Sequence, residues 1–316
     1  MPARKWTAGD LSDQSGRTFI VTGASSGIGL IAARELARVG ARVVLAVRDT
    51  DKGRRAVGSI PGATEVRRLD VASLASVRAF ADEWTGPIDV LINNAGIMAV
   101  PEGRTPDGFE LQAATNYLGP FLLTNLLLPA ITDRVVTVSS QLHRQGHIHL
   151  DDLNWEHRRY SPTRAYNDSK LAGVLLTEEL QRRLAASGSP VRAVTAHPGI
   201  AMTHLGDNAD RISKAIYRYL GWFFNDAERG ALPTLYAATE DVPGGAYIGP
   251  DGLGHLRGYP TMHQPSRSAR DPETARHLWD VASQLTAAGQ GATTQPSRPG
   301  SPSKSSPSET CSPGPS

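Results

Sequence analysis

Residues Thr22 to Gly29 read Thr-Gly-Ala-Ser-Ser-Gly-Ile-Gly, a glycine-rich turn from which the fold can be predicted. It follows the β-branched run Thr18–Thr22 and opens the helix-period stretch Ile28–Val39. Glycines at such a turn let the backbone bend sharply and approach an anion, which the free N–H groups of the helix attract. The sequence therefore predicts a cradle for the pyrophosphate of a dinucleotide, and a purely structural turn is the alternative.

Strands and helices alternate from this turn up to about residue 250. The expected strands are Thr18–Thr22, Arg42–Val47, Glu65–Leu69, Val90–Asn93, Arg134–Ser139, Arg192–His197 and Ala246–Ile248. The expected helices are Ile28–Val39, Thr50–Ser59, Leu74–Trp84, Ala113–Ala130, Tyr166–Ala186 and Ala227–Thr239. Several of these strands are apolar on both faces, as in a parallel sheet covered on both sides. The predicted fold class is α/β, with a single Rossmann-type doubly wound parallel sheet of about seven strands and helices on both faces.

Composition divides the chain into three segments: a polar N-terminal extension (1–15), the α/β domain (16–286) and a tail (287–316). Eighteen of the thirty tail residues are Ser, Pro or Gly. Such a segment buries too little apolar surface to offset the entropy of ordering it. We therefore predict that the tail is disordered.

Charge and cysteine content narrow the class of partner. The net charge is +2, from 33 basic and 31 acidic side chains, so nucleic acid is not an expected partner. Cys311 is the only cysteine, which precludes a disulfide framework within the chain and fits a cytoplasmic location. No apolar run reaches the roughly 18 residues that span a bilayer, and no membrane span is expected.

The end of the second strand bears on the choice of dinucleotide. Arg48 comes directly after this strand and Asp49 follows it. An arginine at this place suits the 2′-phosphate of NADP, whereas an acidic side chain suits the free 2′-hydroxyl of NAD. Arg48 favours NADP(H), and NAD(H) remains possible if Asp49 takes the ribose.

A tyrosine and a lysine share one face of the helix expected from residue 166. Tyr166 and Lys170 are separated by one helical turn, so their side chains lie close together. A free tyrosine hydroxyl has a pKa of about 10, which a nearby ammonium lowers. The pair can then exchange a proton with a substrate alcohol or carbonyl. The expected reaction is hydride transfer, which needs a nicotinamide cofactor and no metal.

The spacing TGxxxGxG resembles the glycine turn of the short-chain dehydrogenase/reductase family, and other marks of that family follow in order. By this resemblance Asn116, Ser140, Tyr166 and Lys170 form the catalytic set, with Ser139 beside Ser140. Asp70 would contact the adenine, with capping of the next helix as its alternative, and Asn116 has the alternative of a buried helix asparagine. The residues expected to bind the cofactor are Thr22, Gly23, Ser25, Ser26, Gly27, Ile28, Gly29, Arg48, Asp70, Val71, Asn94, Ala95, Gly96, Tyr166, Lys170, Pro198, Gly199 and Thr203.

The 26-residue gap between Ser140 and Tyr166 narrows the resemblance. Together with Asp152-Leu153-Asn154-Trp155, it is similar to the branch containing retinol dehydrogenases, WW-domain oxidoreductases and light-dependent protochlorophyllide reductases. A membrane anchor, WW domains and core cysteines, which mark particular members of that branch, are not found in this sequence. The substrate is expected to be a small, rather apolar carbonyl or alcohol, and residues 204–225 are expected to cover it.

The resemblance also bears on the assembly of the protein, and the sequence allows an alternative function. Family members commonly pair through the helices that match 113–130 and 166–186, so a homodimer or homotetramer is possible. The alternative function is a dinucleotide-binding redox sensor or scaffold without turnover. His143, His147 and His149 are close in sequence but are expected on a loop, where they form no metal site.

Overall fold

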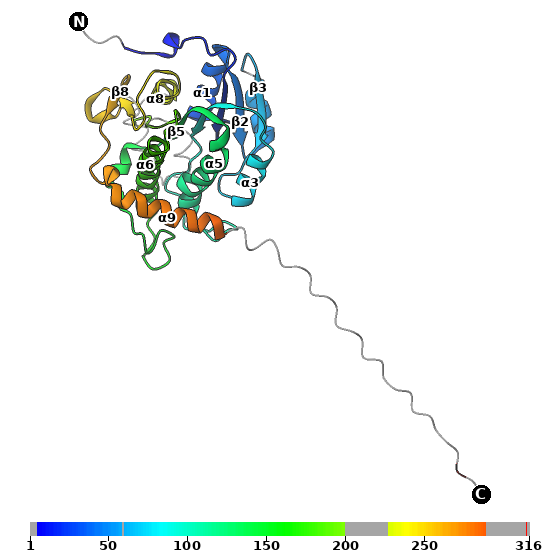
Figure 1. The fold of residues 1–316 in the computed structure, drawn as a ribbon, viewed down its shortest axis with the longest axis vertical. Coiled ribbons are helices and arrows are strands. Elements are labelled where there is room, and N and C mark those ends of the chain that lie inside the picture. Colours follow the sequence, from blue (N-terminus) through cyan, green and yellow to red (C-terminus); the bar gives the residue numbers. More distant parts are fainter. Residues whose placement is uncertain (1–4, 59, 200–226, 289–313, 315–316) are drawn as a thin grey trace.

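The core of the protein is one eight-stranded sheet in the order β3-β2-β1-β4-β5-β6-β7-β8 (Figure 1). This computed structural model describes residues 5–58, 60–199, 227–288 and 314. The strands are β1 (Thr18–Thr22), β2 (Arg42–Val47), β3 (Thr64–Arg68), β4 (Ile88–Asn93), β5 (Ile131–Val138), β6 (Arg192–Ala196), β7 (Tyr247–Pro250) and β8 (Pro260–His263). The first seven run parallel, so the predicted fold class is confirmed.

The strand β8 is an element that the sequence did not reveal. It pairs antiparallel with β7, where Tyr247 faces His263 and Pro250 faces Pro260. Proline is tolerated because β8 lies at the edge of the sheet, where its missing N–H interrupts no ladder. Four residues beginning with proline show no alternation, which is why only seven strands were expected.

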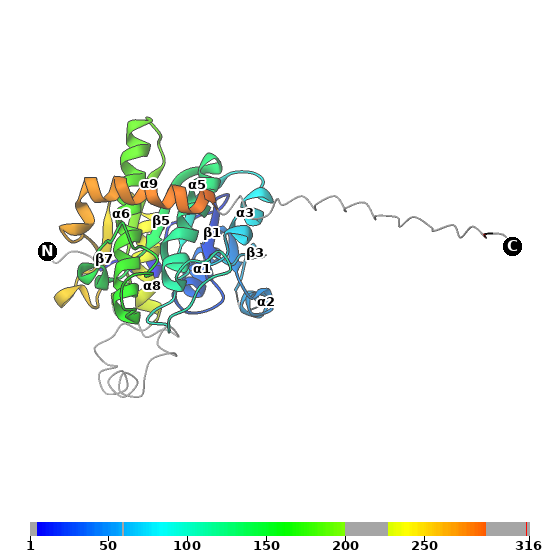
Figure 2. The same ribbon diagram turned by 90° about the horizontal axis from the view of Figure 1, so that it is seen from below.

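Helices cover both faces of the sheet, and Figure 2 shows the three layers. The helices α1 (Gly27–Arg38), α2 (Thr50–Val57) and α8 (Ala227–Thr239) pack on one face. The helices α3 (Leu74–Asp82), α5 (Gly119–Leu127), α6 (Pro162–Ala186) and α9 (Pro272–Ala288) pack on the other. The helix α9 was not expected from the sequence.

The helix expected at residues 113–130 is broken into pieces. It begins as α4 (Leu111–Ala113), widens into a π-helical turn (Ala114–Leu118), continues as α5 and ends in the 3-10 turn Leu128–Ala130. A π turn inserts one residue into the helix, and such turns are frequent at functional sites. Asn116 lies in the middle of this turn.

The face where two copies were expected to pair is partly covered by the chain itself. The helix α9 packs along α6 and also contacts α5 (Figure 1). Trp279 of α9 meets the ring of Phe121 edge-on, with 4.8 Å between ring centres. The guanidinium of Arg183 lies 4.6 Å from the ring centre of Trp279.

The first described residues also pack on this body. The indole Nε1 of Trp6 donates to Glu240 at 3.1 Å, and its ring meets Tyr236 of α8 edge-on at 5.3 Å. Arg38 of α1 donates to the carbonyl of Ala8 at 2.7 Å.

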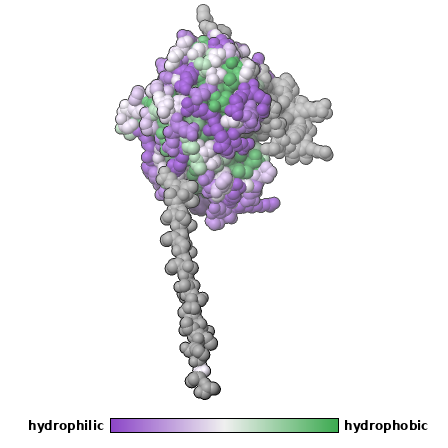
Figure 3. Space-filling model, turned by 90° about the vertical axis from the view of Figure 1, so that its right-hand side faces the viewer, coloured by the Kyte–Doolittle hydropathy of each residue, from purple (hydrophilic) through white to green (hydrophobic). Residues whose placement is uncertain are grey.

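At the other side of the molecule, the surface around the β3 edge is mostly hydrophilic, with small hydrophobic patches (Figure 3). In the described part of the chain, no helix has the length and apolar content needed to cross a membrane.

Candidate functional site

The glycine-rich turn between β1 and α1 is locked to the end of β4. The hydroxyl of Thr22 accepts the backbone N–H groups of Asn94 at 3.0 Å and Ala95 at 2.9 Å, and Asn94 Nδ2 donates to the carbonyl of Thr22 at 2.8 Å. A Cβ added at Gly23, whose φ is +68°, would lie 2.9 Å from Cα of Ala95. Glycine at this position is thus required both by the backbone conformation and by the close approach of β4.

A cavity of about 470 Å³ opens at the carboxyl ends of the central parallel strands. In open α/β sheets, this is the crevice where ligands bind. The expected cofactor residues that line it are Gly23, Ser25, Ser26, Gly27, Ile28, Gly29, Arg48, Asp70, Val71, Asn94, Ala95, Gly96, Tyr166, Lys170 and Pro198. Asp49, the alternative partner of the ribose, lines it as well. Seven lining residues were not expected: Val47, Lys52, Leu69, Ile97, Thr115, Val138 and Ser139.

Basic side chains gather at the end of the cavity next to β2. Arg48 is exposed there, and Nζ of Lys52 on α2 lies 3.4 Å from the hydroxyl of Ser26. Asp49 caps α2, since its carboxylate accepts the backbone N–H of Lys52 at 2.9 Å. That hydrogen bond holds the pKa of Asp49 below its ordinary value. Asp49 therefore caps the helix and also lines the cavity, beside the two cations Arg48 and Lys52.

The alternative role considered for Asp70 is not the one observed. Ser73 is the N-cap of α3 and accepts the backbone N–H of Ser76 at 3.3 Å. Asp70 accepts the N–H of Ala72 at 3.0 Å in the turn before the helix. Asp70 thus lines the cavity without capping α3.

Tyr166 and Lys170 lie side by side on α6, as their spacing predicted. Both are nearly fully buried, and Nζ of Lys170 lies 5.7 Å from the ring centre of Tyr166. Nζ also donates to the carbonyl of Val138 at the end of β5, at 3.1 Å. Burial lowers the pKa of Lys170 to about 8. The ammonium form therefore still predominates at neutral pH, beside the tyrosine.

Asn116 is engaged by the loop that follows β4. Its Oδ1 accepts the N–H of Ile97 at 2.9 Å, and its Nδ2 donates to the carbonyl of Ile97 at 3.0 Å and to Ser169 at 2.8 Å. A Cβ added at Gly96 would lie 3.1 Å from Oδ1 of Asn116 and 3.3 Å from Nζ of Lys170. Asn116 and Lys170 thus both lie next to Gly96. Most hydrogen bonds of the Asn116 side chain go to backbone groups.

The two serines after β5 point to different surroundings. Ser139 lines the cavity, and its hydroxyl donates to the carbonyl of Lys170 at 3.1 Å. Ser140 is half-buried and does not line the cavity; its hydroxyl accepts the N–H of Leu142 at 3.2 Å. The sequence alone did not distinguish these two environments.

The remaining expected residues lie beyond the cavity or outside the described chain. Gly199 is buried next to Pro198 with a φ of +72°. Thr203 and the stretch 204–225 lie outside the described residues. His143 was expected on a loop. Instead it is fully buried in the 3-10 helix Gln141–Gln145. Over the described ranges, no group of three His, Cys, Asp or Glu side chains is arranged to hold a metal ion.

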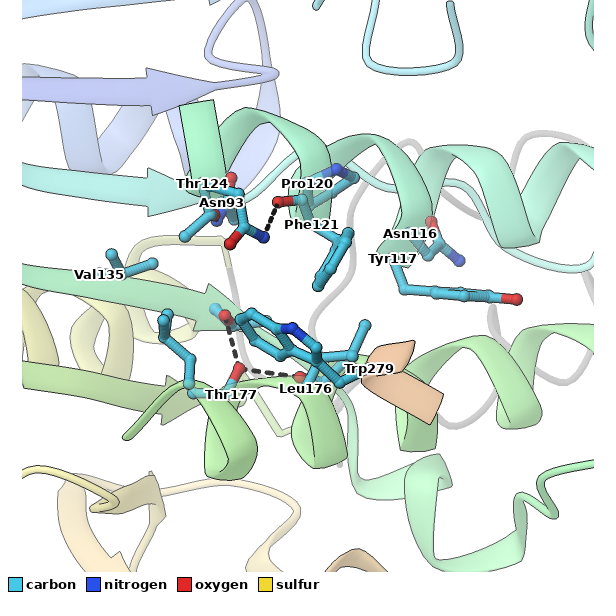
Figure 4. Close-up of a pocket in the computed structure, with 14 residues that line it drawn as sticks. Asn93, Asn116, Tyr117, Pro120, Phe121, Thr124, Val135, Leu176, Thr177 and Trp279 are labelled. Carbon is cyan, nitrogen blue, oxygen red and sulfur yellow. Dashed lines mark hydrogen bonds between the residues drawn. The ribbon is translucent and has the colours of Figure 1, made fainter. Parts of the chain in front are cut away.

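A second, much smaller cavity lies between α5, α6 and α9 (Figure 4). Its volume is about 30 Å³, and its walls are mainly apolar, with Phe121, Leu176 and Trp279 among them. Asn93 donates to Thr124 at 2.8 Å, and Thr177 donates to Thr137 at 2.8 Å. This space suffices for a water molecule but not for a substrate.

Comparison with known proteins agrees with this architecture. Residues 17–212 match the family model described as short chain dehydrogenase. The chain is similar to retinol dehydrogenase 13 of Homo sapiens, with 42% identity over 291 residues that span 85% of this chain and 84% of that protein. It is similar to polyprenol dehydrogenase of Mus musculus, with 42% identity over 301 residues, 89% of this chain and 87% of that protein.

A solved structure agrees as well. The chain resembles an uncharacterised protein from Mycobacterium paratuberculosis with a TM-score of 0.80 and 52% identity, over 90% of this chain and 98% of that one. The chain therefore belongs to the short-chain dehydrogenase/reductase family and is an NAD(P)-dependent oxidoreductase. The predicted resemblance to the retinol dehydrogenase branch is confirmed.

Proposed function

We propose that this protein transfers a hydride between NADP(H) and an apolar carbonyl or alcohol, with Tyr166 as the acid and base. The observation that carries the proposal is the buried Lys170 ammonium beside the Tyr166 ring, within a dinucleotide-sized cavity. The nicotinamide would supply or accept the hydride. Tyr166 would give the proton to the substrate oxygen during reduction, or take it during oxidation. The positive charge of Lys170 stabilises the phenolate, which is the form of Tyr166 after it has given its proton in reduction and before it takes one in oxidation.

The other expected site residues have supporting roles in this proposal. Ser140, which lies two residues after β5 and outside the dinucleotide cavity, would donate a hydrogen bond to the substrate oxygen. Asn116 would bind the backbone of Ile97 and so hold the neighbouring Gly96 in its position next to Lys170. The glycine turn would cradle the pyrophosphate, because the free N–H groups at the start of α1 attract an anion. Gly23 lets this turn lie closely against Ala95. Thr203, which lies outside the described residues, would bind the cofactor.

The preference for NADP(H) is supported by charge. Arg48 and Lys52 line one end of the cavity, and Lys52 reaches the hydroxyl of Ser26. Two cations and a hydroxyl suit a 2′-phosphate. The carboxylate of Asp49, which would favour NAD(H), is already bound to the first turn of α2.

The choice of an apolar substrate is supported by the relatives. Retinol and polyprenol, which appear in the names of two similar proteins, are alcohols with long isoprenoid chains. A cytoplasmic location and a homodimer or homotetramer remain predictions from the sequence, and α9 leaves only part of the α5–α6 face for pairing.

The decisive experiment replaces Tyr166 by Phe, which removes only the hydroxyl. With NADPH and a panel of retinal and aliphatic aldehydes, we expect kcat to fall by about 100-fold or more, because general acid catalysis is lost. The Kd of NADPH should stay within about twofold, since the glycine turn and the basic residues are untouched. Fluorescence titration measures the Kd, and NADPH absorbance measures kcat.

The matched control is Tyr236→Phe on α8, where the ring packs against Trp6 away from the cavity. This variant should keep the wild-type kcat. Wild-type turnover by Tyr166→Phe would refute the assigned mechanism. Binding of NADPH without turnover of any carbonyl by the wild type would favour the redox sensor or scaffold instead.

A further inference from the structure

A second amide holds the loop after β4, in the same way as Asn116. Gln112 precedes Asn116 by four residues and has no exposed surface. Its Oε1 accepts the N–H of Ala99 at 2.8 Å, while Asn116 binds Ile97 two residues earlier. Ala99 has a φ of +50°, a left-handed conformation that is costly for alanine. The hydrogen bond from Gln112 helps to keep the loop in this conformation.

The other end of the same amide holds the start of α6. Nε2 of Gln112 donates to the carbonyl of Pro162 at 2.9 Å. Pro162 is the first residue of α6 and stands four residues before Tyr166, which is one helical turn. Gln112 thus bridges the loop that lines the cofactor cavity and the helical turn that leads to Tyr166.

Two further side chains fix the orientation of this bridge. Nε2 of Gln112 also donates to the hydroxyl of Tyr160 at 3.0 Å, which in turn lies 3.0 Å from Oε1 of Glu110. Burial and the Glu110 carboxylate raise the pKa of Tyr160, so its hydroxyl stays protonated and can donate. Both oxygens of Glu110 also accept N–H groups of α4, from Gln112 and Ala113. Every polar atom of the Gln112 side chain is therefore used, and the amide has one favourable orientation.

We propose that Gln112 is a positioning residue for the oxidoreductase reaction, keeping Tyr166 in place relative to the loop at Ile97–Ala99. The inference rests on the proposed function. Two parts of the chain meet at this one side chain: the loop after β4, through Ala99, and residues 160–162, where the chain enters α6. A displacement of about 1 Å between reacting groups can cost about 100-fold in rate. Gln112 touches neither the cavity nor the reacting atoms, so it acts through the position of Tyr166.

The test replaces Gln112 by Met, which has a similar length and no hydrogen-bonding amide. We expect kcat to fall by about 10- to 100-fold. The Kd of NADPH should change by no more than about threefold, because the glycine turn, Arg48 and Lys52 keep their contacts. The matched control is Gln14→Met, at another buried glutamine, which binds Ser12 and Arg17 near the N-terminus. It should lower the melting temperature and leave kcat unchanged.

A second variant keeps the inference testable if Gln112→Met does not fold. In Gln112→Glu, a protonated carboxyl can still donate to the carbonyl of Pro162, whereas an ionised one cannot. The ratio of its kcat to the wild-type kcat should therefore rise as the pH is lowered from 8 to about 6. Circular dichroism at each pH checks that the folded fraction of Gln112→Glu stays constant, so that a recovery of kcat reports on the position of Tyr166 and not on stability.

The outcomes separate this inference from the proposed function. If the wild type is active, Tyr166→Phe is inactive, and both Gln112 variants turn over like Gln14→Met at every pH, the positioning role is wrong and the proposed function stands. If Tyr166→Phe remains fully active, the proposed function itself fails. A loss of kcat at constant NADPH affinity in Gln112→Met, with the pH-dependent recovery in Gln112→Glu, supports both.

Discussion

At the scale of single residues, two neighbours after β2 illustrate how context assigns a role. Arg48 and Asp49 were both candidates for the ribose in the sequence. In the structure Asp49 accepts the N–H of Lys52 and caps α2. The same helix then places the Lys52 ammonium near Ser26. Sequence reasoning missed Lys52, because its approach to Ser26 depends on where α2 packs and not on a motif.

The basic pair leads to a prediction about cofactor choice. Lys52→Met and Arg48→Met should each raise the Kd of NADP by about 10-fold, since a hydrogen bond to a charged group contributes about 1.5 kcal/mol or more. The Kd of NAD, which lacks the 2′-phosphate, should stay nearly constant. Isothermal titration of both dinucleotides measures the change. Arg55→Met is the control, because Arg55 is exposed on the same helix but does not line the cavity. Tighter binding of NAD than of NADP by the wild type would contradict the proposed preference.

Among the elements, the broken helix from Leu111 to Ala130 differs most from what the sequence predicts. An uninterrupted helix was expected, yet a π turn occurs at Ala114–Leu118. Directly after this turn, Gly119 packs so tightly on the carbonyl of Val71 that a Cβ would overlap it. Asn116 and Gln112 hold the loop after β4 from the same stretch. Helix propensity depends on neighbouring residues in the chain. The π turn, in contrast, coincides with contacts to the loops after β3 and β4, which a local sequence pattern does not reveal.

The close approach at Gly119 can be tested by Gly119→Ala. The added methyl group would push α5 away from Val71, and we expect a loss of about 1–3 kcal/mol in the free energy of unfolding. Because Val71 lines the cavity, the affinity for NADP should fall as well. Urea unfolding and titration measure the two effects.

The matched control is Gly173→Ala in the middle of α6. There a Cβ would lie 3.7 Å from Thr137 Cγ2 and 3.8 Å from the carbonyl oxygen of Asn116, which are ordinary contact distances. This variant should be neutral or more stable by up to about 1 kcal/mol, because alanine favours the helix. Equal effects of the two substitutions would show that the close approach of Gly119 to Val71 does not require a glycine.

At the scale of the whole molecule, buried histidines from separate segments meet beside β7. His143, His197 and Tyr247 are all buried; His197 stacks on Tyr247 at 5.2 Å, and the Tyr247 hydroxyl lies 3.1 Å from His143 Nδ1. His263 of β8 lies 6.4 Å from His197. Burial lowers the pKa of all three histidines, that of His197 to about 3. The fold thus holds these imidazoles in the neutral form.

Stability should therefore fall as the pH drops below about 6.5. The unfolded chain takes up a proton on His197 near pH 6.5, whereas the folded chain resists until about pH 3. Within this window the free energy of unfolding should decrease by about 1.4 kcal/mol per pH unit from His197 alone. Urea unfolding between pH 7.5 and 5.5 measures the slope, and the carboxylates of Glu35 and Asp133, whose pKa values are lowered, stay ionised there.

Two histidine variants separate this effect from general acid sensitivity. His197→Asn removes the titrating ring and should give a shallower slope, although it is less stable at pH 7.5. His157→Asn changes an exposed histidine and should leave the slope at the wild-type value. A wild-type slope in His197→Asn would show that His197 does not titrate as proposed.

From the sequence alone we could predict the first seven strands and six of the helices, the glycine turn and the Tyr166–Lys170 pair. Each of these depends on residues within a few positions of one another, so periodicity and spacing suffice to predict them. Three contacts became visible only in the folded chain: Lys52 with Ser26, Gln112 with Pro162 and Tyr247 with His143, which are 26, 50 and 104 residues apart. These contacts exist because the packed sheet brings distant segments together, and no local pattern in the chain encodes which of them will meet.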